Sequence, residues 1–321
     1  MAARGFDWRL ALRSLKGLEW NWLLAALVPI FGTYYGRALR WAVFLKPLKP
    51  HPSTWNLLSA TIVGFTAIAL FGRPGEFVRP VLIARKEEVP IPSQLAAWVL
   101  ERIFDLLMAL LVFGFALSRV HASGMQVGER LAWVLVLGGR IVAISCVSLL
   151  ALLLSLRHFA EPARRVLLRL LNVLPEKKYE RAEKLIGAFV QGVESTKSDG
   201  ALLLIFLYSV IEWVLIAACY WCLAKAFRGT ITLSIVDVLI YMGFVTFGAA
   251  VQIPGIGGGV QVVSIVVLTE LFGVRLELAS TFSVLIWILT FVAIVPFGFV
   301  LAFKEGLDWR SLRRIQDQVP K

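Results

Sequence analysis

The stretch that decides the fold of this chain reads Phe71-Gly72-Arg73-Pro74-Gly75-Glu76-Phe77-Val78-Arg79-Pro80. It follows one apolar segment, and the apolar segment after it carries Glu101, Arg102 and Asp105. Glycine and proline break helices, and a broken backbone inside a membrane occurs only where it is buried in protein or lines a wet cavity. Because ionisable groups inside a spanning helix mark a functional site by default, the sequence predicts a site here.

A second stretch has the same character and reads Gln252-Ile253-Pro254-Gly255-Ile256-Gly257-Gly258-Gly259-Val260-Gln261. Gly72 and Gly75 of the first stretch align with Gly255 and Gly258 of the second. We interpret this as an internal duplication, which is common in transporters that form their site at the repeat interface from discontinuous helices. The alternative, that glycine-rich turns before apolar helices recur by chance, stays open.

The composition indicates a membrane protein. Of the 321 residues, 59% are hydrophobic and 17% are charged, whereas a soluble domain has about 45–50% apolar and about 25% charged residues. Several apolar runs reach the roughly 17–25 residues that a bilayer-spanning helix needs. We therefore predict an all-α protein, a polytopic integral membrane helical bundle. We expect about seven to eight transmembrane segments with two Gly/Pro-broken or re-entrant repeats.

The net charge of +12 does not indicate a nucleic-acid partner here. The basic residues cluster between apolar runs, as the positive-inside rule requires, and they are expected to meet lipid headgroups. The chain divides into a basic interfacial segment (1–19), a first membrane half (20–156), a cytoplasmic amphipathic basic segment (157–199), a second membrane half (200–303) and a basic tail (304–321). We expect both termini and the 157–199 segment on the cytoplasmic side.

Charged residues inside the apolar segments are the candidate site. Glu101 and Asp105 are four residues apart and share a helix face. Arg102 lies nine residues after Ser93, a predicted N-cap, or roughly 13 Å along the helix, which is too deep for simple snorkelling. Glu212 lies near the middle of another apolar segment and needs a partner or a proton. For Arg40, snorkelling at a helix end and headgroup contact are equally compatible with the sequence.

Nothing in the sequence indicates an enzyme. Cys219 and Cys222 lie in an apolar segment beside aromatic residues and fit helix packing better than a metal or redox site. The three histidines, His51, His121 and His158, are scattered, and no nucleophile–base pair is recognisable. We predict no catalytic residue, no metal site and no cofactor.

The chain resembles the membrane domain of lysylphosphatidylglycerol synthases, also called the flippase-like family. The resemblance is carried, in order, by Arg37-Ala38-Leu39-Arg40-Trp41, Gly72-x-x-Gly75-Glu76-x-x-Arg79-Pro80, Ala84-Arg85-Lys86-x-x-Val89-Pro90, Glu101-Arg102-x-x-Asp105, and Ile253-Pro254-Gly255-x-Gly257-Gly258. It implies a protein that moves a polar-headed lipid between leaflets, without the soluble aminoacyl-transferase domain of the two-domain synthases.

The sequence departs from the family pattern at three places. An N-terminal span that is frequent in the family has no counterpart before residue 20, Gln261 stands where a glutamate is common, and Ile286-Trp287 replaces an aromatic–arginine pair. We therefore expect the first repeat to be the charged half.

We hypothesise a lipid translocase in the cell inner (cytoplasmic) membrane, with a cavity between the repeats. The glycine-rich turns would bring helix N-termini to a phosphate. Its partners would be membrane lipids with anionic or zwitterionic headgroups, and a lipid-modifying enzyme is a further possible partner. A membrane-embedded transferase acting on lipid-linked substrates and an accessory subunit are the alternatives. The predicted substrate-binding residues are Arg40, Gly72, Gly75, Glu76, Arg79, Glu101, Arg102, Asp105, Glu212, Pro254, Gly255, Gly258 and Gln261.

Overall fold

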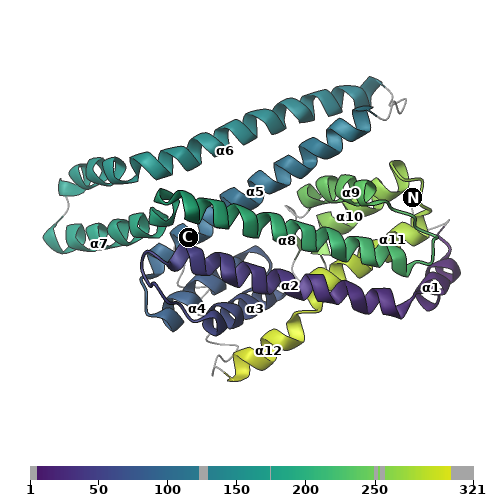
Figure 1. Cartoon of the computed structure of the whole chain (residues 1–321), viewed down its shortest axis with the longest axis horizontal. Helices are drawn as coiled ribbons and strands as arrows, with labels where there is room; N and C mark the ends of the chain where they lie inside the picture. Colours follow the sequence, from purple (N-terminus) through teal and green to yellow (C-terminus); the bar gives the residue numbers. More distant parts are fainter. Residues whose placement is uncertain (1–5, 123–128, 174, 249–251, 254–256, 305–321) are drawn as a thin grey trace.

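The computed structural model describes residues 6–122, 129–173, 175–248, 252–253 and 257–304, and nearly all of them are helical (Figure 1). The first half contains α1 (Trp8–Lys16), α2 (Trp20–Leu45), α3 (Thr54–Phe71), the 3-10 helix η1 (Arg73–Phe77), α4 (Val78–Glu87) and α5 (Ile91–Ala122). A helical hairpin follows, made of α6 (Glu129–Leu170), η2 (Leu171–Val173), α7 (Glu176–Val193) and η3 (Glu194–Lys197). The second half contains α8 (Asp199–Ala226), α9 (Ile235–Gly248), the two-residue strands β1 (Gln252–Ile253) and β2 (Gly257–Gly258), α10 (Gly259–Glu270), α11 (Leu276–Trp287), the π-helix η4 (Ile288–Val292) and α12 (Val295–Lys304).

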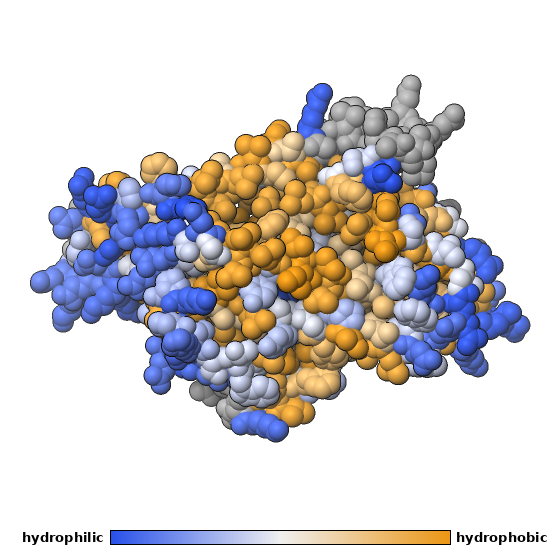
Figure 2. Space-filling view, viewed as in Figure 1, coloured by the Kyte–Doolittle hydropathy of each residue, from blue (hydrophilic) through white to orange (hydrophobic). Residues whose placement is uncertain are grey.

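The predicted all-α membrane class is confirmed. Four helical segments in the described residues are long and apolar enough to cross a bilayer: Thr54–Phe71, Arg140–Leu170, Asp199–Ala226 and Leu276–Lys304. Helices α2 and α5, with 26 and 32 residues, have sufficient length but carry charges. Figure 2 shows apolar residues over the middle of the visible face and hydrophilic residues at both ends, as expected for a protein embedded along this axis.

Helix α8 defines the two ends of the molecule, because its 28 residues extend about 42 Å. At its first residue, Asp199 pairs with Arg157 of α6 at 2.6 Å, and this end, which also holds α7, is called the α7 end. At its last residue, the Ala226 carbonyl accepts a hydrogen bond from the Glu19 amide at 2.9 Å, next to α1. This second end is called the α1 end (right in Figure 1).

The two basic segments, 1–19 and 157–199, therefore lie at opposite ends of a spanning helix. The expectation that both face the cytoplasm is wrong. The prediction assigned each segment to the cytoplasm from its own basic residues. In the structure, three helices between the two segments (α2, α5 and α6) each run from one end to the other, and an odd number of crossings puts the segments at opposite ends. The predicted division at residue 156 also falls inside the continuous helix α6.

The first broken stretch forms a re-entrant hairpin. After α3, Gly72 takes a left-handed backbone (φ 71°) that favours glycine, and η1 folds back along α3. Three contacts mark the antiparallel path: Gly75 lies against Ala67, Arg79 lies against Gly64, and Glu87 accepts a hydrogen bond from the Asn56 amide. The chain thus returns to the α7 end, where it entered.

Helix α4 is buried as the returning arm of the re-entrant hairpin, although its charges are also compatible with an interfacial segment. Arg79, Val81, Leu82, Ile83 and Glu87 are all buried. Lys49, from the loop after α2, pairs with Glu87 at 2.8 Å and so holds the end of α4 at the bundle surface. Helix α5 begins at Ile91, and Ser93 donates to the Pro90 carbonyl at 2.6 Å instead of capping the helix.

Replacing Gly75 by alanine should destabilise the protein by about 1–3 kcal/mol, the usual cost of overpacking. A Cβ atom at this position would lie 2.6 Å from the Ile68 backbone nitrogen, so η1 would have to move away from α3. Thermal unfolding in detergent measures the change. Gly36→Ala is the matched control, because a Cβ there meets nothing within 4 Å; equal unfolding temperatures for the two variants would contradict the close approach.

The second broken stretch forms a hairpin that enters from the opposite end. Helix α9 follows α8 at the α1 end, strands β1 and β2 make the turn, and α10 runs back beside α9, where Ser264 meets the Tyr241 hydroxyl at 2.6 Å. Helix α11 then starts next to α1, as the hydrogen bond from the Asp7 amide to Glu277 shows. The element order α2–α3–turn–α4–α5 is repeated as α8–α9–turn–α10–α11 with inverted direction, a pattern found in transporters.

Helices of the two repeats also pack against each other. Helices α2 and α8 pack along each other over their length, α5 packs against α9 of the other repeat, and α12 packs against α3. Two buried apolar clusters fill the halves, one containing Ile30 and Tyr241 toward the α1 end and one containing Trp41 and Ile205 toward the α7 end. The charged residues of the predicted site lie between these two clusters.

Candidate functional site

Eight charged side chains from both repeats meet at the boundary between the two apolar clusters. They are called the charge cluster, and they are Arg37 and Arg40 (α2), Glu76 (η1), Arg79 (α4), Glu101, Arg102 and Asp105 (α5) and Glu212 (α8). Four arginines face four carboxylates, so the formal charge of the cluster is zero. This balance is what allows charges to remain in a low-dielectric interior, where an unpaired ion is expensive.

Arg40 is the centre of the charge cluster. Its side chain is 0% exposed, and its guanidinium reaches Glu101 at 2.7 Å, Asp105 at 2.8 Å and Glu212 at 3.4 Å. It also donates to the Ser209 hydroxyl at 2.8 Å. Arg40 therefore ties α2 to α5 and to α8. Snorkelling is excluded for this side chain, because its charged end points into the bundle.

Glu101 is shared among three arginines. It is fully buried and pairs with Arg40 through one oxygen and with Arg79 and Arg102 through the other. The Arg79 guanidinium stacks on the Trp41 ring, 4.2 Å from its centroid, a favourable cation–π position. Arg79 is 4% exposed, yet among the described residues its Nη1 has no hydrogen-bond partner.

Glu212 connects the two repeats. It pairs with Arg37 and Arg40 of α2, and Arg37 lies over the Phe65 ring at 4.6 Å. The carboxylate that the sequence placed alone in an apolar segment thus has two cationic partners from the helix that packs along α8.

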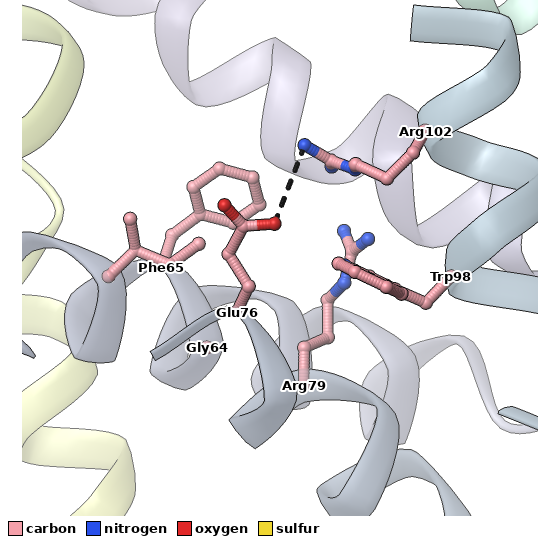
Figure 3. Close-up of a pocket in the computed structure, with 7 residues that line it drawn as sticks. Gly64, Phe65, Glu76, Arg79, Trp98 and Arg102 are labelled. Atoms are coloured by element: carbon pink, nitrogen blue, oxygen red, sulfur yellow. Dashed lines mark ion pairs between the residues drawn. The ribbon is translucent and has the colours of Figure 1, made fainter. Parts of the chain in front are cut away.

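A narrow pocket opens beside the charge cluster. Its walls are Gly64, Phe65, Ile68, Glu76, Arg79, Trp98 and Arg102. Figure 3 shows Arg102 and Glu76 facing each other across it, with Arg79 and Trp98 alongside. Arg102 is 36% exposed and Glu76 18%, and the two are 3.9 Å apart. The interior has room for about one water molecule, so anything larger enters only if these ion pairs open.

The structure brings together seven of the predicted site residues, namely Arg40, Glu76, Arg79, Glu101, Arg102, Asp105 and Glu212. Gly72 and Gly75 build the turn that carries Glu76 and leads into α4 with Arg79. In the second repeat, Gly258 has a φ of 126°, and its amide donates to the Gln261 side chain at 2.7 Å, so Gln261 caps α10. A substrate-binding role for these two residues stays a prediction. Pro254 and Gly255 lie outside the described residues.

Sequence reasoning missed several residues of the site. Arg37 was considered together with Arg40 but was not among the predicted substrate-binding residues, although it lies three residues before Arg40 on the same helix and shares its face. Phe65, Trp98 and Gly64 gave no signal, since aromatic residues and glycines are frequent throughout the apolar segments. Gly64 matters because a Cβ there would lie 2.6 Å from the Arg79 Cβ, so it permits the close approach of α4.

The protein is thus a multi-pass membrane helical bundle in which two inverted re-entrant hairpins flank a neutral charge cluster. The chain belongs to the family described as the lysylphosphatidylglycerol synthase TM region, whose family model matches residues 1–298. This confirms the predicted resemblance and supports a role connected with membrane lipids. No curated protein and no solved structure matches the chain.

Proposed function

We propose that this protein is a lipid translocase that binds the phosphate of a lipid headgroup between Arg79 and Arg102. The observation that carries the proposal is the buried Arg79 guanidinium, which lines the pocket and has an Nη1 without a hydrogen-bond partner among the described residues. A buried donor of this kind favours an acceptor, and a phosphate suits a planar guanidinium that donates several hydrogen bonds.

Glu101 stands in for the phosphate when the pocket is closed. It holds Arg79 and Arg102 through one carboxylate oxygen, as a phosphate oxygen would. When a headgroup takes over these two arginines, Glu101 keeps its pair with Arg40 at 2.7 Å. The exchange therefore leaves Glu101 paired, which lowers its cost.

The inverted hairpins supply a route for movement between leaflets. One hairpin opens toward the α7 end and the other toward the α1 end, and rocking of one repeat against the other exposes a central site to each side in turn. Lys46, Lys49 and the many basic residues of 157–199 gather at the α7 end. By the positive-inside rule we assign the α7 end to the cytoplasm and propose the inner membrane as the location.

A leaflet-sidedness assay in proteoliposomes tests the proposal. We expect Arg102→Ala to lower the rate of transfer of a fluorescent phospholipid at least tenfold, because one of the two phosphate-binding arginines is lost. Arg119→Ala is the matched control, an exposed arginine on the same helix. Arg102→Ala and Glu101→Gln both transferring lipid at the wild-type rate would overturn the assignment.

The other functions considered from the sequence stay predictions. A transferase would create a new lipid species, whereas a translocase only moves one, so mass spectrometry of lipids from expressing cells separates them. A lipid-modifying enzyme partner would be detected by co-purification through the α6–α7 hairpin.

A further inference from the structure

Glu76 is the carboxylate of the charge cluster that faces the pocket directly. It is in the short turn η1, on the wall opposite Arg102 (Figure 3). Within the part of the chain that the structure describes, Arg102 is its one ion-pair partner, at 3.9 Å. The other three carboxylates have closer partners, since Asp105 and Glu101 pair with Arg40 at 2.8 and 2.7 Å and Glu212 pairs with Arg37.

The charged groups around Glu76 come from three elements. Helix α4 contributes Arg79, and α5 contributes Arg102 together with Glu101 and Asp105, which pair with Arg102. Helix α3 presents only uncharged residues to the pocket, and Arg73 is on the exposed surface of η1 itself. Glu76 thus faces two arginines that already pair with other carboxylates, Arg79 with Glu101 and Arg102 with Asp105.

A bound phosphate changes this balance. The cluster is neutral, so a phosphodiester with one negative charge brings the site to −1 and draws Arg102 away from Glu76. The Glu76 carboxylate would then face the phosphate across the same pocket, and two like charges a few ångströms apart away from bulk water repel strongly. One positive charge placed at Glu76, either a proton or a cationic group, removes this repulsion.

We propose that Glu76 selects headgroups by charge, an inference that rests on the proposed phosphate site. A lipid whose headgroup carries phosphate alone binds together with one proton on Glu76, and the protonated carboxyl then donates a hydrogen bond to the phosphate. A lipid that carries phosphate and an ammonium group binds without a proton. Its ammonium takes the place of the proton beside Glu76, between the Phe65 and Trp98 rings, where cation–π contact is available.

Calorimetric binding of two short-chain lipids in detergent tests the inference. We expect the protein to take up one proton for each phosphatidylglycerol molecule that it binds. The proton count is obtained from the difference between the binding enthalpies measured in two buffers of unequal ionisation enthalpy. Its affinity should fall about tenfold for each pH unit as pH rises, because the bound state holds one more proton than the free state. Phosphatidylethanolamine should bind with no proton uptake and with an affinity that does not change between pH 6 and 8.

The variant Glu76→Gln locates the proton. It should bind phosphatidylglycerol with no proton uptake and no pH dependence, and bind phosphatidylethanolamine about tenfold more weakly. Glu194→Gln, which removes the surface pair with Lys197, should leave the affinity and the proton uptake unchanged for both lipids. Should Glu76→Gln fail to fold, the proton count of the wild-type protein decides alone.

The outcomes separate the two proposals. Equal proton uptake for both lipids, or uptake that survives in Glu76→Gln, overturns the role of Glu76 while the phosphate site stands. If neither lipid binds at any pH, the phosphate site itself is overturned.

Discussion

Arg40→Met is expected to lower the free energy of unfolding by about 3–5 kcal/mol, the range measured when one partner of a buried ion pair is removed. The side chain is fully buried and holds Glu101, Asp105 and Glu212 together. Methionine fills a similar space but carries no charge, so the three carboxylates lose the arginine that they share. Thermal or denaturant unfolding in detergent micelles measures the loss, and expression is expected to fall with it.

Arg157→Met provides the comparison. Arg157 also bridges two helices, pairing with Asp199 at 2.6 Å, but Asp199 is 86% exposed at the α7 end. Water solvates the carboxylate that remains, so the loss should be below about 1 kcal/mol. If Arg40→Met were as stable as Arg157→Met, the charge cluster would not be the link between the repeats.

Glu101→Gln should have the second-largest effect, a loss of about 3 kcal/mol or more, together with loss of lipid transfer. The amide keeps the size of the side chain but removes the negative charge that Arg40, Arg79 and Arg102 share. Arg79, which is buried against Trp41, is then left with an uncompensated charge.

A double variant distinguishes this electrostatic explanation from simple packing damage. Arg79→Gln in the Glu101→Gln background removes both charges of the pair, so the double variant should be more stable than the sum of the two single losses predicts, with a coupling energy of about 0.5–3 kcal/mol. Additive losses would mean that the two side chains do not interact in the folded protein.

Much of the fold was predictable because it depends on local chemistry. Long apolar runs require helices in a bilayer, and Gly72 and Gly258 mark breaks because both adopt backbone angles that favour glycine. The buried charges were recognisable for the same reason, since Glu101 and Glu212 are too costly in an apolar helix without a purpose.

The partners of those charges were not predictable. Arg40 lies 61 residues from Glu101 and 172 from Glu212 in the chain, and no local pattern states that α2 packs along α8. The charges of α4 are compatible with an interfacial or a re-entrant segment, and only the structure shows the buried, re-entrant one, in which Gly64 lets α4 pack directly against α3.

The sequence by itself determined that this is a helical membrane protein with two glycine-broken segments and a set of intramembrane charges, because those features follow from hydropathy and backbone freedom. Only the tertiary structure decided that four arginines and four carboxylates neutralise one another, that the hairpins enter from opposite ends, and that α1 and α7 lie on opposite sides. Ion-pair energies depend on distances between residues remote in sequence, and the side of a basic segment depends on how many helices precede it across the membrane.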